Sequence, residues 1–117
     1  SVVTTWYCTE TDEDDGSVAT ETVYFYDDNT FKAVESSEGV NVTFATGSYT
    51  GDTTKDGNIV ITIKKIVKGA LDDSDSLELV DVPAEYASLF GAIATINGNT
   101  MSTRDASSGE LSAWIKK

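Results

Sequence analysis

Hydrophobic and polar residues alternate with a period of two along most of the chain. In the stretch NIVITIKKI, Ile59, Ile61 and Ile63 occupy every second position. Successive side chains of a β-strand point to opposite faces, so this spacing predicts a strand with one buried face. The same period recurs in SLELVDV and in ELSAWIKK. We expect eight or nine strands, over residues 2–10, 18–26, 30–36, 40–50, 58–67, 77–82, 91–97, 100–104 and 110–116.

Clusters of turn-forming residues separate these strands. Asn97-Gly98 is the strongest short hairpin signal, because an Asn-Gly pair readily adopts the positive φ angles of tight hairpin turns. Short strands at regular spacing with such turns predict a sandwich or a barrel rather than βαβ units. The other clusters lie at residues 12–16, 27–29, 36–39, 51–57, 72–75 and 107–109.

One segment breaks the period of two. VPAEYASLFG has apolar residues at helical spacing, with Pro83 near its start and Gly91 after its end. We therefore expect a short helix over residues 83–90. Turns of an antiparallel meander alternate between its two ends, which places the acidic turns 12–15, 36–39 and 70–75 at one end. The same rule places the helix at the opposite end.

The stretch VYFYDDNTFKAV divides its aromatic residues between two faces. Phe25 is a better core residue than tyrosine, so we place Phe25 inside and Tyr24 and Tyr26 on the outer face. Tyrosines in that position are able to stack on a sugar ring or on a side chain of a protein partner.

The length of 117 residues predicts a single domain, residues 1–117, large enough to fold without disulfides or metals. The one cysteine, Cys8, lies on the same strand face as Trp6, where a buried, inert thiol is expected. The formal charge of −12 opposes binding to nucleic acids and to anionic lipids. No apolar run is long enough for a membrane-spanning helix.

The chain begins with Ser1, and its only methionine is Met101. We expect that the chain was either processed or trimmed, and a removed export signal would fit this start. Together with the abundance of Thr, Ser, Asp and Gly, it favours an exported bacterial protein, located in the periplasm, at the cell surface or outside the cell.

Histidine is absent, which removes Ser-His-Asp triads and histidine-based zinc sites. We expect no enzyme activity and no cofactor. The acidic stretches 12–16 and 72–75 do not fit the spacing of an EF-hand loop, so we interpret them as solvated turns rather than calcium sites.

Five segments together resemble the bacterial lipocalin-like domains: TTWYC, VYFYDDNTFKA, GSYTGD, GNIVITIKK and ATINGNTMS. Those domains begin with a Gly-x-Trp strand and continue as an up-and-down meander. The resemblance covers nearly the whole chain; Thr4 and Asn29 stand where the family has glycines, and the helix at 83–90 interrupts the meander. It implies a closed barrel with Trp6 at its base, a mouth rimmed by the acidic turns, and the helix over the base.

We therefore expect an all-β, lipocalin-like barrel with one short helix, with a two-sheet sandwich as the alternative. The first functional hypothesis is a carrier of a small apolar ligand, neutral or cationic, held in the barrel interior by Trp6, Phe25, Phe44 and Ile61. The alternative is a surface module that binds protein or glycan through Tyr24, Tyr26 or the acidic loops. A hydrolase is the third and least favoured hypothesis, which a carboxylate pair facing each other across a cleft would support. An open apolar cavity would favour the carrier, and a filled interior with an exposed aromatic patch would favour the surface module.

Overall fold

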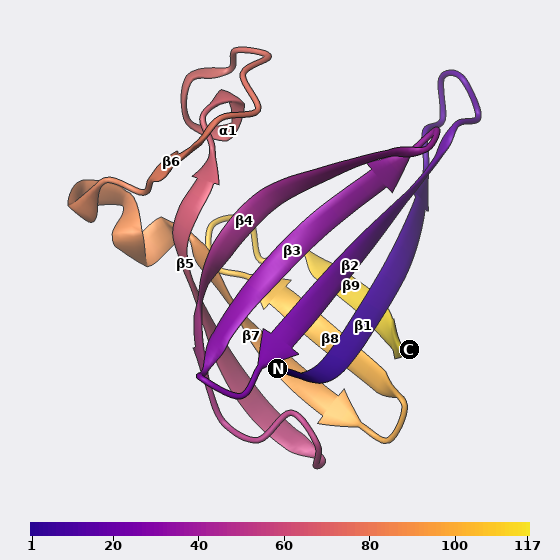
Figure 1. Cartoon of the computed structure of the whole chain (residues 1–117), viewed down its shortest axis with the longest axis vertical. Coiled ribbons are helices and arrows are strands. Elements are labelled where there is room, and N and C mark those ends of the chain that lie inside the picture. Colours follow the sequence, from indigo (N-terminus) through magenta and orange to yellow (C-terminus); the bar gives the residue numbers. More distant parts are fainter.

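The computed structural model describes all residues 1–117, and they form nine antiparallel strands and two short helical segments. Strands β1 to β5, β7, β8 and β9 follow one another around a closed barrel in which β4 pairs with β5 and β9 pairs with β1 (Figure 1). The strands are β1 (Val2–Thr11), β2 (Val18–Tyr26), β3 (Thr30–Ser37), β4 (Val40–Thr50), β5 (Gly57–Val67), β6 (Leu79–Asp81), β7 (Gly91–Asn97), β8 (Thr100–Asp105) and β9 (Leu111–Lys116). The helical segments are α1 (Gly69–Asp72) and the 3₁₀ helix η1 (Ala84–Leu89).

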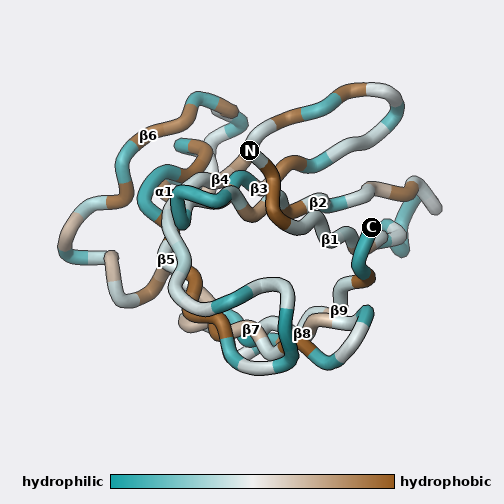
Figure 2. Tube along the Cα trace, turned by 60° about the horizontal axis from the view of Figure 1, so that its bottom comes forward, coloured by the Kyte–Doolittle hydropathy of each residue, from teal (hydrophilic) through white to brown (hydrophobic).

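The barrel confirms the expected all-β fold and rules out a two-sheet sandwich. Each expected strand is present, with small differences at the ends. The expected strand 77–82 is reduced to β6, which pairs only with β5 and lies outside the barrel. Figure 2 shows the barrel strands as a ring, with β6 outside it.

The two ends of the barrel differ in the turns that surround them. We call the end with the turns at 27–29, 51–56 and 97–99 the base. We call the opposite end, with the turns at 12–17, 38–39 and 106–110, the mouth. The long connection 68–90 also leaves the barrel at the mouth end, because it follows the last residue of β5.

The expected position of the helix over the base is wrong. Since β6 is not a barrel strand, the whole segment 68–90 forms one connection between β5 and β7, and η1 lies beside β5 on the outside (Figure 1). The base is closed instead by the β4–β5 loop. Thr53 in that loop is only 2% exposed, and its hydroxyl bonds to Thr4 of β1.

The barrel closes through a short seam between β1 and β9. Only Trp6 and Tyr7 of β1 pair with β9, opposite Lys116 and Ile115. Towards the mouth, β1 continues to Thr11 paired with β2 alone. The edges of β1 and β9 that face each other above the seam therefore have no strand partner.

The core consists of side chains from the inward faces of the strands. Trp6 and Phe25 are fully buried, whereas Val60, Ile93 and Ile115 point outward and are about half exposed. The buried hydrophobic residues are Trp6, Val23, Phe25, Phe31, Ala33, Ala45, Tyr49, Ile59, Ile66, Ala94, Ile96, Met101 and Trp114. None of the helical segments has the length and apolar character that crossing a membrane would require.

Candidate ligand cavity

A cavity of about 210 Å³ lies inside the barrel towards its mouth. Most of its wall is apolar and comes from seven of the eight barrel strands, all except β1. The apolar lining consists of Val23, Phe31, Ala33, Phe44, Ala45, Ile61, Ile63, Ala92, Met101 and Trp114, and the rest of Glu21, Gly91, Thr103, Asp105, Glu110 and Ser112.

Small residues explain why this part of the interior is hollow. Ala33 of β3, Ala45 of β4 and Ala92 of β7 occupy inward positions where a larger aliphatic side chain would occupy the space. Ala33 and Ala45 are also direct partners across β3 and β4. Two adjacent short side chains leave a volume that their neighbours do not fill.

The four residues expected to line the interior fall into two pairs. Phe44 and Ile61 line the cavity. Trp6 and Phe25 do not, because they are fully buried below it, towards the base. The ring of Phe25 meets that of Tyr49 edge to face, with centroids 4.8 Å apart. The lower interior is therefore packed core, and only the upper interior is hollow.

Hydrogen bonds hold the base shut beneath these aromatic rings. The Nε1–H of Trp6 donates to Oγ1 of Thr4 at 3.1 Å, and that hydroxyl donates to Oγ1 of Thr53 at 2.9 Å. Trp6 thus lies at the closed end, as the resemblance implies. Thr4, which stands where the lipocalin-like pattern has a glycine, accepts the hydrogen bond from the indole.

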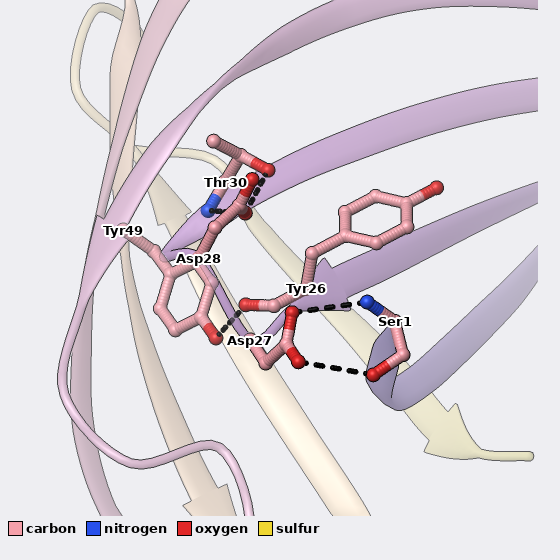
Figure 3. Close-up of polar contacts among 6 residues, drawn as sticks. All are labelled: Ser1, Tyr26, Asp27, Asp28, Thr30 and Tyr49. Atoms are coloured by element: carbon pink, nitrogen blue, oxygen red, sulfur yellow. Dashed lines mark hydrogen bonds and ion pairs between the residues drawn. The ribbon is translucent and has the colours of Figure 1, made fainter.

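A second bond secures the neighbouring turn. The hydroxyl of Tyr49 donates to the backbone oxygen of Tyr26 at 2.6 Å, and the side chain of Asp28 accepts from Thr30 (Figure 3). The turn follows directly after β2, so these bonds fix the β2–β3 hairpin at the base of the barrel.

Tyr24 and Tyr26 are half-buried rather than fully exposed. The ammonium of Lys32, the residue opposite Tyr24 on β3, lies 5.4 Å from the centre of the Tyr24 ring. The outer face of Tyr24 is therefore already in contact with a cation of the same chain.

Three carboxylates belong to the cavity wall: Glu21, Asp105 and Glu110. Glu21 comes from β2, Asp105 ends β8, and Glu110 precedes β9, so all three lie towards the mouth. No lysine or arginine lines the cavity, and the three ion pairs of the molecule all lie elsewhere. The charge facing the cavity is thus entirely negative.

Glu21 is the innermost of these carboxylates and is half-buried. It lies opposite Cys8 on β1 and Glu35 on β3. Burial, followed by repulsion from Glu10 and Glu35, raises the pKa of Glu21 from 4.5 to about 7. Near neutral pH this carboxyl is therefore poised between its neutral and its charged form.

Asp105 is held differently. Its Oδ1 accepts bonds from the hydroxyl of Ser107 at 2.6 Å, the backbone N–H of Ser107 at 2.8 Å and that of Ser108 at 3.0 Å. These bonds, the Ser107 hydroxyl first, lower the pKa of Asp105. Asp105 therefore carries a full charge near neutral pH while it shapes the β8–β9 turn.

Donor atoms of Cys8, Glu10 and Glu21 lie within 4.8 Å of one another, a spacing that a metal ion could bridge. Burial, with Glu21 and Glu10 nearby, raises the pKa of the Cys8 thiol to about 11. A metal or an electrophile reacts with the thiolate, which is scarce at neutral pH for this residue. Cys8 is half-buried rather than fully buried. Its inertness remains a prediction, which the raised pKa supports.

The sequence predicts a negative charge at the mouth, but it does not identify the carboxylates that line the cavity. The acidic turns 12–15, 36–39 and 70–75 do lie at one end, as expected. The cavity carboxylates are other residues. Glu21 could have been found, since it is two and four positions from the inward Val23 and Phe25. Asp105 and Glu110 depend on how the barrel closes.

No protein-family model matches the chain, and no match was found among curated proteins or among solved structures.

Proposed function

We propose that this protein is a lipocalin-type binding protein that holds a small apolar ligand in the upper part of its barrel. The cavity of about 210 Å³ with its apolar wall is the observation that supports this proposal. A closed barrel has no free sheet edge along its paired strands, and its interior is a common place for one small ligand. We include in the proposal that the protein is not an enzyme and that it is exported.

The size of the cavity limits the ligand. Drug-sized ligands occupy pockets of roughly 300–1,000 Å³, whereas an apolar cavity of about 150 Å³ is enough for benzene. A volume of about 210 Å³ suits a single ring with a short tail. Phe31, Met101 and Trp114 would then be its main apolar contacts.

Methyl NMR of the protein titrated with phenethyl alcohol tests this function. We expect saturable shifts of the Met101, Ile61 and Ile63 methyl groups, with a Kd at or below about 1 mM for a molecule of this size. Ile93 and Ile115 serve as matched controls on the outer face, where they are 55% and 45% exposed. Chemical-shift changes confined to Ile93 and Ile115 would refute the proposal. So would the absence of a saturable shift with any single-ring compound of this size.

A further inference from the structure

We propose that the ligand is a small organic monocation whose ammonium group lies beside Glu21 at the acidic mouth of the cavity while its apolar body fills the cavity. This inference rests on the proposed function, because it assigns a ligand class to the same cavity. Its basis is the combination of an apolar wall with a one-sided distribution of charge.

The polar part of the wall contains acids and no basic group. Glu21, Asp105 and Glu110 are the only ionisable residues that line the cavity, and none of them has an ion-pair partner. At a separation of about 4 Å near a protein surface, two unit charges interact strongly enough to change affinity by tenfold or more. A ligand carboxylate in this position is repelled, and an ammonium group is attracted.

The arrangement separates a charged end from an apolar end. The three carboxylates come from β2, the end of β8 and the turn just before β9, all near the mouth, where water reaches a ligand's charged head. Deeper in the cavity, Phe44 and Trp114 offer aromatic surface. Aromatic faces also attract cations, so they tolerate a head group that moves inward. A molecule with one ammonium and one apolar ring matches both ends.

The ionisation of Glu21 gives this site a dependence on pH. A cation beside Glu21 favours its charged form, so binding releases a proton wherever the free protein holds Glu21 partly neutral. Affinity for a cation therefore rises as pH increases through about 7, the pKa of Glu21 in the free protein. The titratable groups next to Glu21 are Cys8 and Glu10 from β1 and Glu35 from β3. Asp105 and Glu110 line the same cavity.

Three probes with the same ring and different heads test the inference: phenethylamine, phenethyl alcohol and hydrocinnamate. Titrations use calorimetry and methyl NMR at low ionic strength and about pH 8, where an alkylamine of pKa about 10 remains protonated. We expect the amine to bind at least about tenfold more tightly than the alcohol. We expect the carboxylate to bind more weakly than the alcohol.

Variants identify the carboxylate responsible. Glu21→Gln should weaken amine binding by about tenfold and leave alcohol binding within about twofold. Glu85→Gln removes the same charge from η1, outside the barrel, and should change neither. If Glu21→Gln fails to fold, Glu110→Gln at the exposed rim provides the same comparison.

The outcomes separate this inference from the proposed function. Equal affinity of the amine and the alcohol would overturn the monocation and leave the cavity function standing. If Glu21→Gln weakens the binding of the amine and of the alcohol equally, Glu21 only supports the fold. That result also overturns the assignment of a monocation to the cavity. Tighter amine binding on addition of EDTA would identify a metal as the occupant that competes for the carboxylates and would overturn the monocation. Absence of all three probes from the cavity would overturn the proposed function itself.

Discussion

Filling the cavity from its wall should stabilise the protein, and Ala33→Ile is the substitution to make. Ala33 is 4% exposed and lines the cavity between Val23 of β2 and Ala45 of β4. Isoleucine adds three carbon atoms, each worth about 0.8 kcal/mol when buried. Fixing the longer side chain costs about 0.5–1 kcal/mol. The net expectation is a gain of about 1.5 kcal/mol in the free energy of unfolding.

Ala94→Ile is the matched control. Ala94 is fully buried on an inward position of β7, but it does not line the cavity. The same three carbon atoms must there enter packed core, and overpacking costs about 1–3 kcal/mol. Ala33→Ile should therefore raise the free energy of unfolding and Ala94→Ile should lower it, with a difference of roughly 3 kcal/mol between the two variants.

Urea unfolding followed by the fluorescence of Trp6 and Trp114 measures both values. The slope of the unfolding free energy with urea should be unchanged, so that a shift of the midpoint reports stability alone. Ala33→Ile should also abolish binding of phenethyl alcohol, because it occupies the same volume. If Ala33→Ile destabilises the protein as much as Ala94→Ile does, the upper interior is packed and the reasoning from the cavity is refuted.

Three further predictions concern the mouth, the base and the seam. Because the pKa of Glu21 is raised in the folded protein from 4.5 to about 7, its protonated form stabilises the fold at low pH and this contribution is lost as pH rises through that window. Urea unfolding at a series of pH values tests this with Glu21→Gln. The variant should match the wild type in its free energy of unfolding near pH 4 and exceed it by roughly 1–2 kcal/mol above pH 7, a range that allows for solvent screening. Equal stability of the two proteins at pH 4 and above pH 7 would contradict this. Thr4→Val leaves the Nε1–H of Trp6 buried without an acceptor and should cost about 1–3 kcal/mol in the same assay, whereas the serine variant should cost much less. Hydrogen bonds alternate along β1, so the backbone N–H groups of Thr9 and Thr11 point towards β9, above the short seam. In amide hydrogen exchange they should exchange with solvent faster than the neighbouring N–H groups that bond to β2. Equal protection of the two sets of amides would show that β1 and β9 are paired there.

The order and bounds of the strands were predictable because local signals agree with the final fold. A period of two in the strands and turn residues between them are read from neighbouring positions only. The place of residues 77–82 was not predictable in this way. Leu77 and Leu79 alternate as they would in a barrel strand. Leu77 is nevertheless 62% exposed, and β6 pairs only with β5 and lies outside the barrel. Which strands pair is decided by distant parts of the chain.

The cavity shows a similar limit. Alternation indicates the face of a strand to which a side chain points, but not its depth along the barrel axis. Trp6 and Ile61 both point inward, yet Trp6 lies in packed core and Ile61 lines the cavity. In ELSAWIKK the alternation does not decide between faces, and the structure places Trp114 inside and leaves Ile115 about half exposed. Burying the large indole removes much apolar surface from water, and this decides which face of the strand points inward although the other face carries more apolar residues.

A crystal structure of the protein under xenon pressure tests the central claim, that the upper barrel contains an apolar cavity. Xenon enters dry apolar cavities of this size without needing a matching head group. We predict a xenon atom among Phe31, Met101 and Trp114, with none among Trp6, Phe25 and Tyr49 at the base. Electron density that shows the Phe44 or Trp114 side chain filling this volume, and no xenon in it, would contradict the cavity and the ligand binding inferred from it.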